Sequence, residues 1–367
     1  MPPSDAGDVS FDPAAVRPVG ARGVAVSRLG FGTAPFGDAA NAAEAAARSA
    51  FDAASDAGLR YFDTAPLYGL GLAEHRLGAC LRSVAREEKV ISTKVGRLLK
   101  PRRAQPRGAA AIDRGRPFDY EYDYSYEATI RSLEDSLRRL DSSHVDIVLI
   151  HDVNRRWQGD LLEQRYREAM EGAYRALDDL RRTGEIGAIG VGVNDWEILL
   201  RFAADGDFDC FMLAGRYTLL DHTALDRFMP ECERRSIAVL MAAPYNSGIL
   251  ATGAAPGATF FYTDAPPEIV ERTRSIERIC KRHGVALPAA ALQFPLAHPA
   301  VASVVTGMRT REEVAQNIAH CRRPIPSEFW QELKHEGLIA ITAPVPGVSR
   351  CGAPAPQIPK VERPAST

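Results

Sequence analysis

Short apolar runs alternate with helical patterns along most of the chain, and this alternation limits the fold more than any other feature. We identify eight strand-like runs, each followed by a helical pattern; they lie at residues 29–33, 61–63, 90–94, 145–150, 186–193, 210–213, 238–243 and 301–306. Such alternation implies parallel strands joined by right-handed crossovers. Eight units in roughly 320 residues favour an α/β fold of the (β/α)8 TIM barrel type, with a parallel eight-stranded sheet, over an open doubly wound sheet.

The helical patterns between these runs carry their own end signals. The first pattern begins with Asn41 and Glu44 at the spacing of a capping box, and Gly58 follows its last turn, as is typical of a helix C-terminus. We predict helices at residues 41–57, 72–82, 125–140, a segment ending at Gly184, 195–204, 223–235, 268–283 and 310–320.

The two ends of the chain lack this periodicity. Residues 1–18 are polar and contain prolines, and we expect a flexible N-terminal extension there. The tail at residues 343–367 contains six prolines, too many for a packed element, and is expected to be disordered. No linker interrupts the periodic region, so a single barrel domain is predicted at residues 19–342.

Charge and cysteine content exclude several classes of protein. The 45 Lys and Arg residues nearly balance the 47 Asp and Glu residues, which gives no overall electrostatic reason to bind nucleic acid or an anionic membrane. No apolar run approaches the ~20 residues needed to span a bilayer, and the acidic first 16 residues do not form a secretory signal. The six cysteines include no C-x-x-C pair, so we expect reduced thiols in a cytoplasmic protein, without a disulfide framework or a metal site.

Polar residues stand where the predicted strands run into the following loops, which is where a TIM barrel carries its reactive groups. Asp63 ends the second run, Lys94 the third, and His151 directly follows the fourth; Tyr68 lies five positions after Asp63. Because these three strands are neighbours in the barrel, we expect the four side chains to converge at one mouth. Taken singly, each has a structural interpretation: a helix cap, a solvated strand end, a core histidine and loop packing.

Together the four residues suggest proton transfer on oxygen. A lysine at the end of an apolar strand needs a counter-charge, which Asp63 supplies. A lysine there should lower the pKa of the Tyr68 phenol from its usual value of about 10, so that the phenol exchanges a proton near neutral pH. His151 would orient a carbonyl or hydroxyl oxygen. We therefore expect a site that moves a proton on oxygen while another group moves hydride.

Six segments in order resemble the successive signatures of the aldo-keto reductases, over about residues 20–340; they are residues 29–33, 62–69, 92–96, 149–151, 243–250 and 305–317. The resemblance implies that Tyr68 is the general acid/base, that Lys94 and Asp63 tune it, and that His151 helps to seat the substrate oxygen. It also implies a nicotinamide cofactor and a small sugar or aldehyde as substrate, and it leaves the oligomeric state open.

Within the family, four stretches look most like the aldose 1-dehydrogenase branch; these are residues 118–126, 151–152, 217–221 and 243–248. That likeness implies oxidation of an aldose at C1 to its lactone. Pyridoxal 4-dehydrogenases share much of the pattern, and a general aldehyde reductase is a further alternative. A regulatory subunit that binds the cofactor without turnover is a more remote one.

The resemblance also suggests the cofactor contacts, namely Gly32, Thr33, Asp63, Asn194, Ser247, Gly248, Leu250, Gly307, Arg309, Thr310, Glu313 and Asn317. NADP-using members often have a basic residue where Glu313 stands, so NAD is expected ahead of NADP. Two alternatives remain: Glu313 completes a capping box with Thr310, and Arg309 holds a phosphate. The chain departs from the family pattern at Ala214, where many members have glutamine, and near Ala242, where a stacking aromatic is replaced by small residues.

Three further stretches are weaker signals. Residues 187–192 are glycine-rich but lie inside a strand, so close strand packing explains them better than a dinucleotide fingerprint. The arginine-containing insert at residues 97–116 is predicted to be a solvated loop, and the family resemblance implies that it covers the site and helps to choose substrates. The alternating aromatic residues at 118–126 either pack on the barrel or form a sugar-stacking platform. Trp157 and Arg155 are candidates for lining the mouth, Trp157 as a substrate contact.

Overall fold

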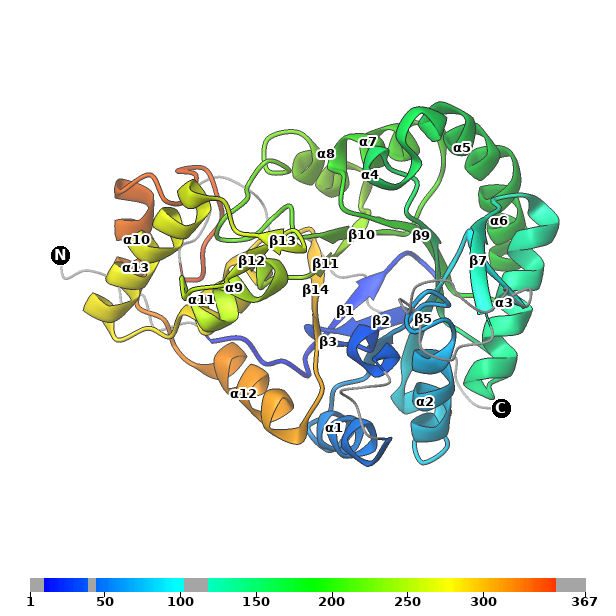
Figure 1. The fold of residues 1–367 in the computed structure, drawn as a ribbon, viewed down its shortest axis with the longest axis horizontal. Helices are drawn as coiled ribbons and strands as arrows, with labels where there is room; N and C mark the ends of the chain where they lie inside the picture. The colour runs from blue at the N-terminus through cyan, green and yellow to red at the C-terminus, as the bar shows by residue number, and fades with distance from the viewer. Residues whose placement is uncertain (1–9, 39–43, 102–117, 348–367) are drawn as a thin grey trace, which may run out of the picture.

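Eight parallel strands form a closed barrel in the computed structural model, which describes residues 10–38, 44–101 and 118–347. Each barrel strand pairs with its neighbour in chain order, and the last pairs with the first, so the predicted TIM barrel is confirmed (Figure 1). The strands are β3 (Leu29–Gly32), β4 (Tyr61–Asp63), β5 (Val90–Val95), β8 (Ile147–His151), β9 (Ala188–Val193), β10 (Cys210–Ala214), β11 (Ala238–Ala242) and β14 (Val301–Gly307).

Helices surround this barrel and cover the outward faces of its strands (Figure 1). Those that follow the barrel strands are α1 (Glu44–Asp56), α2 (Leu72–Leu81), α3 (Tyr126–Leu140), α6 (Arg175–Thr183), α7 (Trp196–Asp205), α8 (Phe228–Arg235), α10 (Pro267–His283) and α12 (Arg311–Arg322). They match the sequence prediction closely, although α8 begins five residues later than predicted, at Phe228 and not at residue 223. The predicted cap of the first helix at Asn41 lies outside the described residues.

Two helices were missed by the sequence patterns: α11 (Leu287–Leu296) and α13 (Ser327–His335). All residues of α11 except Pro288 are buried, so the helix has no polar face and shows no amphipathic period. The shorter helices are η1 (Ala34–Gly37), η2 (Arg86–Glu88), α4 (Arg155–Gln158), η3 (Gly159–Leu161), α5 (Leu162–Glu168), the π-helix η4 (Ala169–Tyr174), η5 (Asn246–Gly248) and α9 (Ile249–Thr252). Within the described ranges, no helix is long and apolar enough to cross a bilayer.

An antiparallel hairpin of β1 (Val16–Val19) and β2 (Val24–Ser27) closes one end of the barrel. Val19, Val24 and Val26 pack with residues near the starts of the barrel strands, such as Ile147 and Cys210, which places the hairpin at the N-terminal end of the strands. The predicted flexible extension is therefore wrong for residues 16–18, whose side chains are exposed but whose backbone pairs with β2. At the other end of the chain, Ala343 and Val345 are buried as well.

A second hairpin follows β5 on the opposite end of the barrel, where β6 (Arg97–Pro101) pairs with β7 (Phe118–Tyr122). The turn into it requires Gly96, because φ is +99° there and a Cβ atom would lie 2.2 Å from the Tyr124 ring. The prediction of a solvated loop is wrong for residues 97–101, and Arg97 is only 2% exposed. The arginines further along the insert, Arg102, Arg103, Arg107 and Arg114, lie outside the described residues.

Candidate active site

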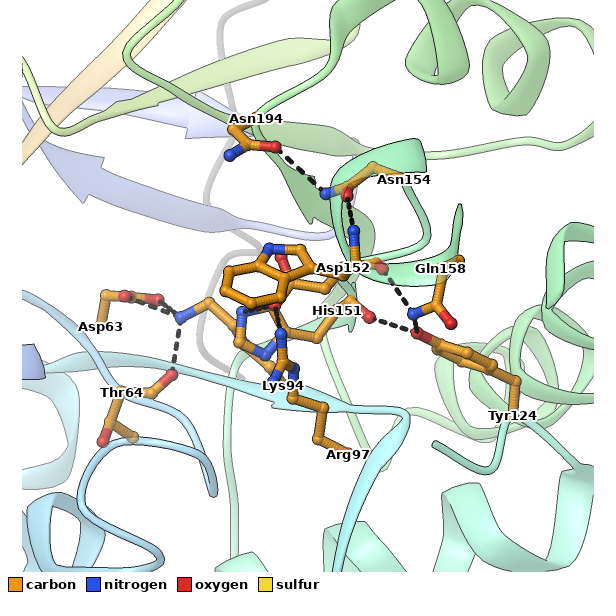
Figure 2. A network of polar contacts seen from close by, with 11 residues as sticks. Asp63, Thr64, Lys94, Arg97, Tyr124, His151, Asp152, Asn154, Gln158 and Asn194 are labelled. Atoms are coloured by element: carbon orange, nitrogen blue, oxygen red, sulfur yellow. Dashed lines mark hydrogen bonds and ion pairs between the residues drawn. The ribbon is translucent and has the colours of Figure 1, made fainter. Parts of the chain in front are cut away.

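A buried ion pair lies at the C-terminal ends of β4 and β5. Lys94, 2% exposed, donates from Nζ to both carboxylate oxygens of Asp63 at 2.8 Å and to the carbonyl oxygen of Thr64, also at 2.8 Å (Figure 2). Asp63 accepts a further hydrogen bond from Ser92 Oγ at 2.7 Å. The expectation that Asp63 is the counter-charge of Lys94 is confirmed, and neither residue is a solvated strand end or a helix cap.

Tyr68 lies in the loop between β4 and α2, with Lys94 Nζ 4.7 Å from the centre of its ring. The loop sits directly on Gly37, where a Cβ atom would lie 2.5 Å from Gly69 N and 2.6 Å from Tyr68 C. Any larger residue at position 37 would push the loop away, so this glycine helps to place the phenol. On its other side, the Tyr68 ring meets His151 edge to face, with ring centres 6.4 Å apart. The four expected catalytic side chains therefore do converge.

The pKa of Tyr68 differs from the sequence expectation. Burial raises the pKa of the phenol to about 12, although Lys94 acts in the opposite direction. Asp63 adds a smaller increase because its negative charge disfavours a phenolate. The prediction of a lowered pKa is thus wrong for the protein without a cofactor. Burial also tends to lower the pKa of Lys94, but Asp63 and Tyr68 outweigh it and raise that pKa, so the ammonium stays charged.

His151, the last residue of β8, is buried and neutral at physiological pH. Burial lowers the pKa of its imidazole to about 3, with Lys94 and Arg97 acting in the same direction and Asp152 against them. The Tyr124 hydroxyl donates to the His151 carbonyl oxygen at 2.7 Å and fixes the backbone there (Figure 2). Nδ1 of His151 has no hydrogen-bond partner among the described residues, which leaves this nitrogen available to a ligand.

A second ion pair, which the sequence reasoning missed, lies beside His151. Arg97 donates to Asp152 Oδ2 at 2.5 Å, and the same oxygen is 3.4 Å from His151 Nε2 (Figure 2). Gln158 donates to the Asp152 carbonyl oxygen at 2.9 Å. The sequence predicts a solvated loop from Arg97 onward, and no sequence signal indicates that this first residue of β6 is buried.

Several expected cofactor contacts occupy the same end of the barrel. Gly32 of β3 and Gly307 of β14 are paired residues at adjoining strand ends. Thr33 is buried, and its Oγ1 donates to the Asp63 carbonyl oxygen at 2.9 Å. Asn194 follows β9 and accepts from Asn154 Nδ2 at 3.2 Å. These groups therefore lie at the C-terminal ends of β3, β14 and β9.

A small cavity lies at the C-terminal ends of β9, β10 and β11. It is lined by Asn194, Ala214, Gly215, Ala243, Asn246, Ser247, Phe261 and Tyr262. The small residues there include Ala214, where the family glutamine is missing. An aromatic ring is nevertheless present: Phe261 belongs to the tip between β12 (Thr259–Phe260) and β13 (Thr263–Asp264). The family pattern suggests a stacking aromatic on the strand near Ala242, so residues 260–262 of the later hairpin were not among the expected contacts.

The Ser247 region holds this tip in place. Ser247 Oγ accepts from Tyr262 N at 3.0 Å, and its carbonyl oxygen accepts from Thr259 Oγ1 at 2.7 Å. Gly248 is the N-cap of α9, whereas Leu250 is fully buried in the core, so its side chain serves packing. Asn317 of α12 accepts from the Tyr245 hydroxyl at 2.5 Å.

The N-terminus of α12 forms the capping arrangement that the sequence allowed. Thr310 Oγ1 accepts from Glu313 N at 3.2 Å, and the Glu313 carboxylate accepts from Arg309 N at 2.7 Å. Arg309 Nε lies 3.4 Å from the same carboxylate. Glu313 therefore has a structural role. Its negative charge also lies beside Arg309, the residue that the sequence analysis considered as a contact for a cofactor phosphate.

Trp157 of α4 stands at the rim and is 43% exposed. The guanidinium groups of Arg97 and Arg156 lie 4.9 Å and 5.4 Å from the centre of its ring. Tyr120 and Tyr122 of β7 also face Arg97. Of the alternating aromatic residues, Tyr120 and Tyr122 thus pack around this arginine.

Comparison with known proteins assigns the class that this barrel and site define. The model of the Aldo/keto reductase family matches residues 28–336, and the chain belongs to that family. It is 41% identical to a pyridoxal 4-dehydrogenase of Microbacterium luteolum, over 88% of this chain and 98% of that protein. It is 37% identical to a D-threo-aldose 1-dehydrogenase of a Pseudomonas species, over 90% and 98%. An aldo-keto reductase of Bacillus halodurans in its holo form has the same fold, with a TM-score of 0.69 at 22% identity over 87% of this chain and 95% of that one.

Proposed function

We propose that this protein oxidises an aldose at C1 to the lactone with a nicotinamide cofactor, NAD in preference to NADP. The observation that carries the proposal is the arrangement around Tyr68: a charged Lys94 held by Asp63 on one side and a neutral His151 on the other. This arrangement suits proton exchange at a hydroxyl or carbonyl oxygen placed between the phenol and the imidazole.

The residues beside this site fit a nicotinamide cofactor. Asn246 Oδ1 is buried in the wall of the small cavity and has no hydrogen-bond partner among the described residues, so it can accept from an amide group. Asn194 offers a second amide, and small residues leave room for a ring. The bound nicotinamide would take up the hydride that leaves the substrate. Gly307 and the first turn of α12 would lie along the rest of the dinucleotide.

The chain's own residues supply the proton chemistry. Tyr68 accepts the hydroxyl proton of the substrate as the C–H bond breaks, and Lys94 stabilises the phenolate that this role needs. Because burial holds the pKa of the phenol at about 12, most Tyr68 is protonated at neutral pH before a ligand binds. His151 orients the substrate oxygen by a hydrogen bond. A cytoplasmic location fits the five described cysteines, which are all buried and free of disulfides.

A second candidate substrate is pyridoxal, because the relative with 41% identity is named a pyridoxal 4-dehydrogenase. Pyridoxal has an aldehyde beside a hydroxymethyl group and can close to a cyclic hemiacetal, as an aldose does. Oxidation of either hemiacetal would give a lactone, so the same groups could serve both substrates. Aromatic residues at the rim, such as Trp157 and Tyr120, could stack on either ring.

The experiment that tests the proposal is the appearance of reduced-nicotinamide absorbance with NAD⁺ or NADP⁺ and one substrate at a time. L-Fucose, D-arabinose and pyridoxal are compared under the same conditions. We expect turnover with a sugar and NAD⁺. Turnover with pyridoxal alone would replace the aldose by the second candidate, and no turnover with any of them, while the cofactor still binds, would contradict both.

The cofactor preference gives a separate prediction at Glu313. Glu313→Gln keeps an oxygen for the Arg309 N–H but removes the charge that would repel a 2′-phosphate. We expect the ratio of kcat/KM for NADP⁺ to that for NAD⁺ to rise about tenfold, which corresponds to ~1.4 kcal/mol. Glu312→Gln, in the same first turn, is the matched control and should leave the ratio unchanged. An unchanged ratio in Glu313→Gln would leave only the capping role.

A further inference from the structure

Arg97, the first residue of β6, is enclosed by aromatic rings and a carboxylate at the rim of the site. Its guanidinium lies 4.8 to 4.9 Å from the ring centres of Tyr120, Tyr122 and Trp157. Its side chain is 2% exposed, and its hydrogen bond to Asp152 Oδ2 is 2.5 Å long. The aromatic faces and the carboxylate replace part of the hydration that this guanidinium loses, although its Nε has no hydrogen-bond partner among the described residues. The charge is therefore held at one place.

Asp152 is held as firmly as Arg97. Its φ is +58°, a left-handed conformation that Asp tolerates better than most residues and that turns the chain sharply after β8. Its N–H donates to the Gly192 carbonyl oxygen at 3.0 Å, and its own carbonyl accepts from Gln158 Nε2 at 2.9 Å. The backbone of Asp152 is thus fixed on both sides, and the carboxylate itself is held by its hydrogen bond from Arg97.

The carboxylate of Asp152 has two neighbours that compete for it. Oδ2 lies 2.5 Å from Arg97 Nη2 and 3.4 Å from His151 Nε2. A carboxylate this close to an imidazole favours the imidazolium, whereas a cation beside both favours the neutral ring. The other charged or titratable groups that face His151 are Lys94 from β5 and Tyr68 from the loop after β4. Among the charged groups that the structure describes around His151, Arg97 is the one that donates a hydrogen bond to the Asp152 carboxylate.

We propose that Arg97 is a positioning residue that holds the Asp152 carboxylate in an ion pair and so keeps His151 neutral for its contact with the substrate oxygen. The inference deepens the proposed function, because it relies on that function for the role of His151 toward substrate. The pairing itself is a property of the protein alone. A neutral imidazole can donate one hydrogen bond and accept another, whereas an imidazolium paired with Asp152 would offer only donors.

The decisive experiment follows the titration of His151 by NMR, using ring signals of labelled histidine. The His151 signal is identified by its loss in His151→Asn. In the unchanged protein we expect it to report a neutral ring down to about pH 4, since burial and the nearby cations lower its pKa to about 3. In Arg97→Gln, Asp152 is left to pair with the imidazole, and the midpoint should rise by about one to three pH units.

Four companion variants make the result specific. Arg97→Met is a second uncharged variant whose straight stem still fits between the rings, and it should shift the midpoint upward as well. Arg97→Lys restores the charge and should return the midpoint toward that of the unchanged protein. Adding Asp152→Asn to Arg97→Gln removes the carboxylate and should cancel the rise. Arg156→Gln, which removes the exposed guanidinium that also stacks on Trp157, should change nothing.

The kinetic counterpart is an acid limb in the pH profile of kcat/KM. Toward acid pH the activity of Arg97→Gln should fall more steeply than that of the unchanged protein, because protonation of His151 adds to the loss of the Tyr68 phenolate. If His151 titrates identically in the folded uncharged variants and in the unchanged protein, the proposal is wrong and Arg97 only links β6 to β8. The titration needs no turnover, so a failure of the proposed function would leave this result interpretable.

Discussion

Tyr68→Phe is expected to lower kcat for the oxidation by about 10²- to 10⁴-fold, the usual contribution of a positioned acid/base. The substitution removes only the hydroxyl that exchanges the proton and leaves the ring beside Lys94 and His151. Steady-state absorbance of the reduced cofactor measures the loss. In the unchanged protein, oxidation should accelerate as the pH rises, because the fraction of Tyr68 present as phenolate increases as the pH approaches the pKa of about 12. The variant should not show this rise.

Two controls separate chemistry from folding in that experiment. Cofactor binding, followed by quenching of protein fluorescence, should change less than about threefold, since the hydroxyl is not part of the cavity near Asn246. The free energy of unfolding should also change little. Near-normal turnover in Tyr68→Phe would show that another group exchanges the proton.

Asp63→Leu is expected to lower the free energy of unfolding by about 3–5 kcal/mol, because it leaves the Lys94 ammonium buried without its counter-charge. Urea denaturation followed by circular dichroism measures the change. The double variant Asp63→Leu with Lys94→Met removes both charges and should recover much of the loss, although it stays inactive.

An exposed ion pair provides the matched control for this prediction. Glu163 and Arg201 are bonded at 2.7 Å but both are well exposed to solvent. Glu163→Gln should cause no comparable loss, because solvent screens that pair and hydrates the remaining arginine. If Asp63→Leu is as mild as Glu163→Gln, the buried pair does not have the structural importance that its burial indicates.

The positions of the candidate catalytic side chains could be predicted from sequence because they depend on strand ends. Once the alternation of runs and helices indicated a barrel, Asp63, Lys94 and His151 had to lie at neighbouring strand ends. Register along a short apolar strand has little freedom, so placing the last residue of each run also placed its side chain at the mouth. Tyr68 could be placed at the same mouth because the loop that carries it, between β4 and α2, is short.

Properties that depend on surroundings could not be predicted in the same way. The pKa of Tyr68 depends on how much burial outweighs Lys94, and burial is a sum over distant parts of the chain. Arg97 looked like the first residue of a charged loop because its aromatic neighbours are contributed by β7 and α4, far along the sequence. The apolar α11 lacks the one-sided pattern by which helices are recognised.

The pairing of β14 with β3 has a consequence for how the protein is made. The two strands are 272 positions apart, since Val301 begins one and Leu29 the other. At a synthesis rate of about 5–20 residues per second, the edge of β3 waits about 14–54 seconds for its partner. During that interval a nascent chain presents an unpaired apolar strand to every other chain nearby. The barrel therefore cannot close until β14 has been synthesised, which is late in the synthesis of the chain.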